Sequence, residues 1–311
     1  MSLDDASLDE LSWSEADVRI PSPVQARRAD DAREYERRSG SSTLENTPAP
    51  VAPAPADPDA PVCLAFQGVG GGAGTTSLAI GVAQSLRTRT GRGVCLVDLD
   101  FELGTCAGYL DVEPGARAED FAVDPGRVDA TFVRALLVEH PGGVSVLAAE
   151  PGSLAANPAT VLAVLDVLSD MFGVLVLDVP RVWQPWTDAV LRAADHAVLV
   201  GELHIPALHR ARGQLDALDA AGVKAGLVLS KYERRSFKAS LRRADAEKAL
   251  ARPVLDVVAT DPHTAAECVN CGEPVVRLSP EGRLAKDVEA LSLALVPARA
   301  DAKSRRKARR R

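Results

Sequence analysis

A ten-residue stretch combines glycines with hydroxyl side chains, two kinds of residue that can bind a phosphate and its magnesium ion. Residues 68–77 read Gly-Val-Gly-Gly-Gly-Ala-Gly-Thr-Thr-Ser. Glycines let backbone N–H groups close around an anion, and the start of a following helix adds partial positive charge. The hydroxyl of Thr76 or Ser77 is placed to hold Mg²⁺. The stretch therefore indicates phosphate binding, with a plain tight connection or a dinucleotide loop as the open alternatives.

Carboxylates at the ends of two apolar segments strengthen this interpretation. Asp98 and Asp100 end the segment Leu-Val-Asp-Leu-Asp (96–100), and Asp178 lies in Leu-Asp-Val-Pro (177–180), which ends another apolar segment. An aspartate that ends a buried strand beside a phosphate loop commonly holds Mg²⁺ through its waters. Any one of them could instead cap a turn. We expect Asp98 and Asp178 to serve the metal, and Asp100 to orient or deprotonate water if hydrolysis occurs.

The elements that must position these residues alternate between strands and helices. Residues 62–67 are a short apolar run typical of a buried strand, and apolar residues then recur at helical spacing. We expect strands near 62–67, 94–98, 144–148, 174–178, 197–201, 225–230 and 254–259. Helices are expected at 76–88, 129–138, 158–171, 186–194, 206–221, 239–249, 263–270 and 282–295. This alternation predicts an α/β fold with a doubly wound, mostly parallel sheet, in which ligands bind at the carboxyl ends of the strands.

Composition predicts one large globular domain between two tails. Of the 311 residues, 46% are hydrophobic, the net charge is −7, and there are five cysteines. The acidic balance argues against general nucleic-acid binding. Cysteines without a signal peptide, and no apolar run near 18 residues, indicate a reducing cytoplasm. The Cys268-x-x-Cys271 pair has no second pair, so metal binding there is not expected.

Both ends of the chain differ in composition from its centre. Residues 1–60 are acidic and then Pro-rich, which predicts a disordered segment, and residues 61–298 form the predicted domain. Residues 299–311 carry a basic run. This tail could contact the anionic inner face of the membrane, or nucleic acid, or remain a solvated tail.

Several stretches together resemble the MinD/ParA class of deviant-Walker P-loop ATPases, and within it the CpaE/TadZ group associated with Tad (Flp-type) pilus assembly. They include the glycine loop, Val-Asp-Leu-Asp-Phe-Glu-Leu-Gly (97–104), Gly-Tyr-Leu-Asp-Val-Glu-Pro (108–114) and Asp-Val-Pro-Arg-Val-Trp-Gln-Pro-Trp-Thr (178–187). The resemblance spans about residues 62 to 296. It implies a homodimer that binds ATP and Mg²⁺ and that positions or regulates pilus or secretion machinery, in the cytoplasm, at the membrane face or at the cell pole.

Aligned on the class loop Lys-Gly-Gly-x-Gly-Lys-Thr-Thr, this chain lacks both lysines. The matching residues are Gly70, Gly71, Gly72, Ala73, Gly74, Thr75, Thr76 and Ser77, so that Gly70 and Thr75 stand where the lysines would be. A charged hydrogen bond is worth roughly 1.5–3 kcal/mol, so one lost lysine weakens nucleotide binding about ten- to a hundredfold. The signature lysine, whose place Gly70 takes, reaches across the dimer in this class and resembles an arginine finger, worth roughly 10³–10⁵ in rate. Weak binding with little or no ATP hydrolysis is expected.

Other residues take places that the class uses for nucleotide. Arg181 follows Asp178 and could clamp a phosphate in place of a lysine, although a surface ion pair is the plainer interpretation. Ser230 and the loop at Asp261-Pro262 stand where the class binds adenine. Trp183 and Trp186 suit core or interface packing, or a partner anchor.

Two further functions remain open from sequence. One is a ParA-like ATPase that positions DNA with its basic tail. A steep salt dependence of duplex DNA binding would favour this function. The other is a scaffold that binds no nucleotide.

Overall fold

A computed structural model describes residues 60–152, 156–233 and 241–297, all within one compact unit. The expected segment 1–60 and tail 299–311 lie almost wholly outside these residues. In the described part, the main sheet has eight strands. Their order across the sheet is β10 (Asp256–Ala259), β9 (Ala225–Tyr232), β8 (His196–Glu202), β1 (Val62–Gly68), β7 (Val174–Val179), β2 (Val94–Asp98), β5 (Ser145–Leu147) and β4 (Leu137–Glu139).

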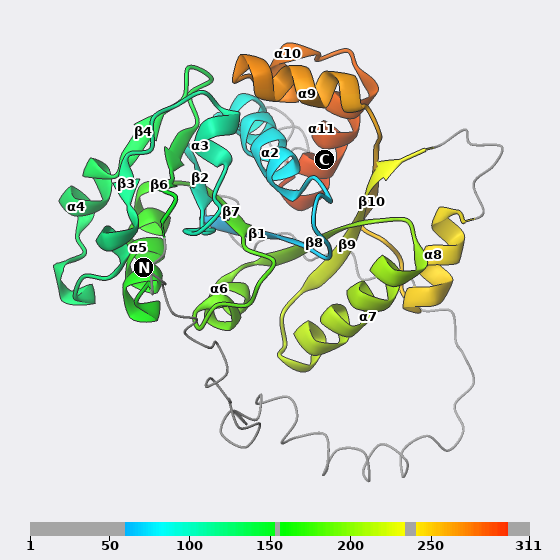
Figure 1. Cartoon of the computed structure of the whole chain (residues 1–311), viewed down its shortest axis with the longest axis horizontal. Helices are drawn as coiled ribbons and strands as arrows, with labels where there is room; N and C mark the ends of the chain where they lie inside the picture. The colour runs from blue at the N-terminus through cyan, green and yellow to red at the C-terminus, as the bar shows by residue number, and fades with distance from the viewer. Residues whose placement is uncertain (1–59, 153–155, 234–240, 298–311) are drawn as a thin grey trace, which may run out of the picture. The chain divides into compact units, whose positions relative to one another are not determined.

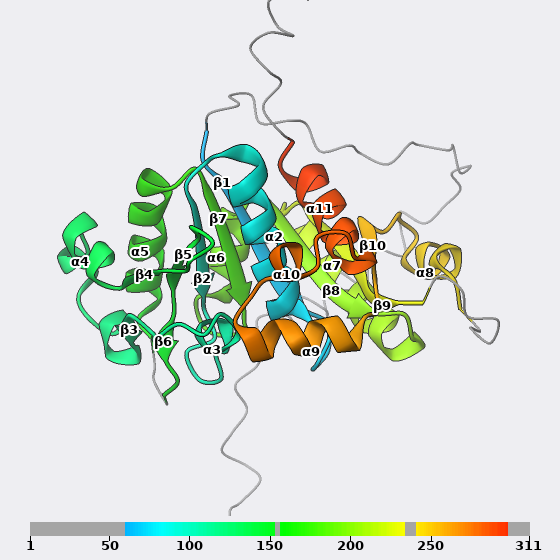
Figure 2. The same ribbon diagram turned by 90° about the horizontal axis from the view of Figure 1, so that it is seen from above.

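Helices cover both faces of this sheet, as Figures 1 and 2 show. One face packs against α2 (Thr75–Thr90), α3 (Cys106–Tyr109), α10 (Val275–Leu278) and α11 (Arg283–Leu295), with α9 (Pro262–Cys271) beside them. The other packs against α4 (Ala130–Ala135), α5 (Pro158–Met171), α6 (Thr187–Ala193), α7 (Ile205–Ala220) and α8 (Arg243–Leu250). The predicted doubly wound sheet is therefore confirmed.

Side-chain alternation along β1 explains the two layers. Leu64 and Phe66 are fully buried in the α2 layer, whereas Ala65 is fully buried in the α7 layer. Because successive side chains of a strand point to opposite faces, a strand covered on both sides must be apolar at nearly every position. The same pattern holds in β7, where all six residues are buried.

The expected helix at 129–138 is wrong at its C-terminal end. Helix α4 stops at Ala135, and residues 137–139 form β4, which pairs antiparallel with β5. Val138 lies opposite Val146 in that pair. A β-branched residue favours a half-buried edge strand, and this pairing outweighs the apolar spacing from which a helix was expected.

Short elements were not expected from the sequence. They are α3, α10, the 3₁₀ turns η1 (Ala118–Phe121) and η2 (Pro125–Arg127), and a two-stranded sheet of β3 (Ala116–Arg117) and β6 (Ala149–Glu150). None is long enough to show a hydrophobic period. The expected helix at 239–249 begins at Arg243, and its residues 239–240 lie outside the described part. Among the described helices, none has the length and apolar character needed to cross a bilayer.

Candidate functional site

The glycine loop joins β1 to α2 at the carboxyl edge of the sheet. Gly72 and Gly74 have φ angles of 71° and 80°, a left-handed backbone that favours glycine. Val69 N–H donates to Val200 O of β8 over 2.8 Å, which fixes the start of the loop. Helix α2 then begins at Thr75, so its free N–H groups lie at the loop. This is the strand, loop and helix arrangement that binds a phosphate.

Three acidic or hydroxyl side chains meet beside this loop. Asp98 and Asp178 lie directly opposite each other on the paired strands β2 and β7. The Thr76 hydroxyl donates to Asp178 Oδ2 over 2.6 Å, from the first turn of α2. A hydroxyl bonded to an aspartate at a phosphate loop is a suitable donor set for Mg²⁺, which prefers oxygen ligands. The predicted grouping of Thr76, Asp98 and Asp178 is therefore present in the fold.

Backbone groups hold Asp98 rigidly. Its Oδ1 accepts from Asp100 N–H over 3.0 Å, and its Oδ2 accepts from Cys106 N–H over 2.9 Å. Gly104 passes so close that a Cβ there would lie 2.7 Å from Asp98 Oδ2 and 2.5 Å from Asp100 O. Only glycine fits this approach, so the turn after β2 is shaped around the carboxylate.

Burial makes the carboxylate pair reluctant to carry two negative charges. Desolvation, followed by the nearby Asp98, raises the pKa of Asp178 to about 7. Desolvation also raises the pKa of Asp98, against the hydrogen bonds from Cys106 and Asp100. The Cys106 thiol is fully buried 3.6 Å from Asp178 Oδ2, and burial with the two aspartates raises its pKa well above the ordinary value. Cys106 is thus a protonated donor, and a divalent cation would relieve the charge repulsion of the pair.

A pocket of about 580 Å³ opens beside this cluster. Its polar end is formed by the loop residues 70–77 with Asp100, Asp178 and Arg181. Its other end is mostly apolar and includes Val258, Ala259, Ala265, Ala266, Val269, Val275, Leu284 and Val288. A pocket of this size, polar at one end and apolar at the other, suits a nucleotide with its phosphates at the loop and its base among the apolar side chains.

All of the residues predicted to contact the nucleotide line this pocket, whereas Asp98, predicted to serve the metal, does not. Arg181 follows β7, Ser230 lies within β9, and Asp261 and Pro262 follow β10, yet all four line the pocket. Asp98 is not one of the described lining residues, since it is only 3% exposed. Ser230 is also largely buried, and its hydroxyl donates to Gly201 O over 3.2 Å. The Ser230 hydroxyl therefore links two strands, which leaves less of it for a base.

Lys231 and Cys106 belong to the site but were not assigned from the sequence. Lys231 lines the pocket, has a left-handed φ of 50°, and pairs with Glu202 Oε1 over 2.9 Å. The signal for Lys231 was its position at the end of an apolar strand, directly after Ser230. Cys106 had no such signal, because nothing in the sequence showed that α3 would place its thiol against Asp178.

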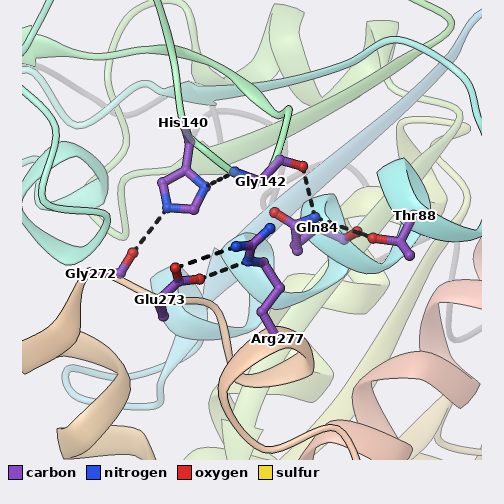
Figure 3. Close-up of polar contacts among 7 residues, drawn as sticks. All are labelled: Gln84, Thr88, His140, Gly142, Gly272, Glu273 and Arg277. Carbon is purple, nitrogen blue, oxygen red and sulfur yellow. Dashed lines mark hydrogen bonds and ion pairs between the residues drawn. The ribbon is translucent and has the colours of Figure 1, made fainter.

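A polar cluster holds the wall of the pocket formed by the α9–α10 connection (Figure 3). His140 Nε2 lies 3.0 Å from Gly272 O, and His140 Nδ1 accepts from Gly142 N–H over 3.0 Å. Gln84 of α2 donates to Gly142 O over 3.1 Å. The next residues after Gly272, Glu273 and Pro274, line the pocket. The turn between β4 and β5 therefore ties this wall to α2.

The two tryptophans differ in environment. Trp186 is 2% exposed and lies edge-on to Phe101 with ring centroids 5.9 Å apart, so it is a core residue. Trp183 is 47% exposed. Cys268 and Cys271 are free thiols, and neither belongs to the buried group of possible metal ligands.

The fold is that of the MinD/ParA class of P-loop ATPases. The cell division ATPase MinD of Pyrococcus furiosus superposes with a TM-score of 0.66 and 25% identity, over 75% of this chain and 98% of that one. The ParA family ATPase of Chlorobium tepidum superposes with a TM-score of 0.67 and 17% identity, over 76% of this chain and 98% of that one. MinD of Pyrococcus horikoshii, solved with Mg-ADP, superposes with a TM-score of 0.65 and 20% identity, over 78% of this chain and 97% of that one.

Part of the chain matches two curated sequences. Two uncharacterized Mycobacterium tuberculosis proteins, one from strain CDC 1551 / Oshkosh and one from strain H37Rv, are each 31% identical over 183 residues. The match covers 57% of this chain and 50% of each of those proteins, so the chain spans about half the length of the relatives it matches. No protein-family model matches the chain.

Proposed function

We propose that this protein binds a purine nucleotide, most simply ATP, together with Mg²⁺ in the pocket beside the glycine loop. The observation that carries this proposal is the 2.6 Å contact between Thr76 and Asp178 at the polar end of a 580 Å³ pocket. The loop N–H groups would bind the phosphates, and Thr76 and Asp178 would hold the metal directly or through water. Bound Mg²⁺ would neutralise phosphate charge.

We further propose that hydrolysis is slow or absent. Asp100 lines the pocket and is the candidate to orient or deprotonate water, but its Oδ1 already accepts from Leu103 N–H over 3.0 Å. The loop has no cation of its own between Gly68 and Ser77. Electrostatic stabilisation of the transferring phosphoryl group supplies most of the rate in this chemistry, so binding should survive better than catalysis.

Calorimetric titration with Mg-ATP tests nucleotide binding. We expect a dissociation constant in the micromolar to millimolar range, and Thr76→Ala should weaken binding about tenfold by removing the metal-facing hydroxyl. Thr90→Ala, the same change at the far end of α2, is the matched control, because the Thr90 hydroxyl makes only local contacts: it donates to Leu86 O and accepts from Arg92 N–H. No heat of binding at millimolar Mg-ATP would leave only the scaffold function.

The same edge of the sheet supports a proposed homodimer. Leu103, Val182, Trp183 and Ile205 are 75%, 60%, 47% and 59% exposed, and they follow the carboxyl ends of β2, β7 and β8. Four exposed apolar side chains around one ligand pocket are suited to a protein contact. A second copy meeting at this edge would enclose both nucleotides, so nucleotide would shift the population towards the dimer.

We propose that this dimer acts in the cytoplasm, where it positions or regulates pilus or secretion machinery of the Tad/Flp type. The support is the resemblance of residues 97–104, 108–114 and 178–187 to the CpaE/TadZ group, together with five free cysteines. If a secretion ATPase is encoded near this chain in its genome, the two proteins should co-purify in a manner that depends on Mg-ATP. Salt-sensitive binding to duplex DNA instead would favour the ParA-like alternative.

A further inference from the structure

Arg210 of α7 is an exposed cation fixed against the glycine loop. Its Nε donates to Val69 O over 3.1 Å, at the first turn of the loop. Its Nη2 lies 3.2 Å from the position that a Cβ would take on Gly70. The guanidinium therefore occupies the space into which a side chain at residue 70 would extend. A glycine at position 70 therefore leaves room for the guanidinium of Arg210.

Neighbouring arginines have carboxylate partners, but Arg210 has none among the described residues. Arg212 of the same helix lies 3.9 Å from Asp216, and Arg252, which follows α8, lies 2.5 Å from Asp219 of α7. Arg210 uses only Nε, so both Nη groups are free to donate within the described part of the chain. Two parallel N–H donors are the group that binds a phosphate in bidentate fashion.

The side of the loop on which the Arg210 guanidinium lies decides which phosphate it could reach. Gly70 lines the pocket, whereas Arg210 is not among the described residues that line it. Arg210 thus lies on the outer side of the loop, on the helix that begins with the exposed Ile205. A second copy that docks through the exposed Ile205 would meet this side of the loop.

We infer that Arg210 supplies the cation that the loop lacks, and that it binds the phosphates of the nucleotide held by the second copy. This inference rests on the proposed nucleotide-dependent dimer. It assigns a specificity-determining residue that reads the polyphosphate length, because a terminal phosphate extends furthest from its own loop. ATP should therefore promote self-association more than ADP does.

Sedimentation of the full chain with Mg-ATP tests the inference. Arg210→Ala should weaken nucleotide-dependent self-association about ten- to a hundredfold, the loss of one charged hydrogen-bonding partner. Arg210→Lys should recover part of the loss, whereas Arg210→Gln should not, although glutamine can still donate to Val69 O. Arg212→Ala, with equal charge change on the same helix, should behave as wild type. The inference would be overturned if Arg212→Ala lost as much self-association as Arg210→Ala, or if Arg210→Gln self-associated as well as wild type.

Mixing two defective chains tests the action across the dimer. One chain carries Arg210→Ala, and the other carries Gly74→Val, which blocks the loop because φ at residue 74 is 80°. Circular dichroism checks that both chains are folded. Recovery of association on mixing is expected, since one complete site forms, and its absence would overturn the inference. If the wild-type chain does not self-associate with Mg-ATP, the proposed dimer itself is wrong. If the wild-type chain self-associates but the mixed chains do not, only the role of Arg210 is wrong.

Discussion

At the scale of single residues, the site depends on a hydroxyl and two carboxylates that are largely buried from solvent. Thr76 lies 2.6 Å from Asp178, and Asp98 and Asp178 are 3% and 7% exposed. Two carboxylates so buried favour a shared proton when no cation is present. The site is therefore expected to exchange a proton for a metal ion, and its charge state to depend on pH.

Stability of the metal-free protein should fall as the pH rises towards neutrality. The pKa of Asp178 is raised to about 7, so the folded chain keeps a proton that the unfolded chain releases near pH 4. Its stabilising contribution is complete below about pH 4 and is lost as the pH rises through about 7. Thermal unfolding in chelator across this range measures the effect, and Asp178→Asn should flatten the slope. Equal slopes for both proteins would contradict the prediction.

Restoring a lysine to the loop should strengthen nucleotide binding. Thr75 begins α2 and lines the pocket, so the ammonium of Thr75→Lys can approach a bound phosphate. We expect affinity for Mg-ATP to rise about ten- to a hundredfold, the value of one charged hydrogen bond. Thr131→Lys is the matched control, the same change at an exposed threonine of α4 that does not line the pocket. Unchanged affinity in Thr75→Lys would mean that the phosphates do not lie against this end of α2.

At the scale of elements, the strands and long helices were predictable, but the pieces that close the site were not. Strands β1, β2 and β7 and helix α2 follow from apolar runs and helical spacing, and Asp98 and Asp178 follow from strand ends. Helix α3 has only four residues, so no periodicity could place Cys106 beside Asp178. Arg210 was also missed, because a basic residue on an exposed helix gives no local signal for a contact 141 residues away.

The turn between β4 and β5 should control the pocket wall at a distance. His140 contacts both Gly142 and Gly272 through its two ring nitrogens, and it is 2% exposed. His140→Ala should lower the free energy of unfolding by about 1–3 kcal/mol, because it leaves buried backbone groups unpaired. It should also weaken Mg-ATP binding, since the residues after Gly272 line the pocket.

Chemical denaturation and calorimetry measure these two effects of His140→Ala. Arg277→Ala is the control in the same cluster, because the ion pair of Arg277 with Glu273 is partly exposed and spans one helical turn. Such pairs contribute roughly 0–1 kcal/mol, so this variant should be nearly as stable as wild type. An equal loss in both variants would show that the cluster has no special role for His140.

At the scale of the whole molecule, the functional residues come from strands that are distant in sequence and meet at one edge of the sheet. The glycine loop follows β1, Asp100 follows β2, Arg181 follows β7, and Asp261 follows β10. Parallel pairing brings the carboxyl ends together, which is why strand–helix alternation alone was enough to predict where the site lies. The exposed apolar residues of that edge could not be predicted, since exposure depends on the packed fold.

Mutation of that apolar edge should weaken self-association. Leu103→Glu places a charge on the most exposed large apolar side chain of the described residues, at 75% exposure. Leu103 also lines the pocket, so calorimetry with Mg-ATP checks nucleotide binding by this variant. A buried unpaired charge costs several kcal/mol at an interface, so Mg-ATP-dependent dimerisation should fall at least a hundredfold. Sedimentation with Mg-ATP measures the loss.

The matched control for Leu103→Glu is Leu255→Glu, the same change on a leucine that is 44% exposed and that precedes β10 at the opposite edge of the sheet. If the carboxyl edge is where two copies meet, Leu255→Glu should dimerise as wild type does once its folding is verified by circular dichroism. A dimer that tolerates Leu103→Glu but not Leu255→Glu would place the contact at the amino edge. Arg210 could not then reach the phosphates of a second copy, because it lies at the carboxyl edge beside the loop.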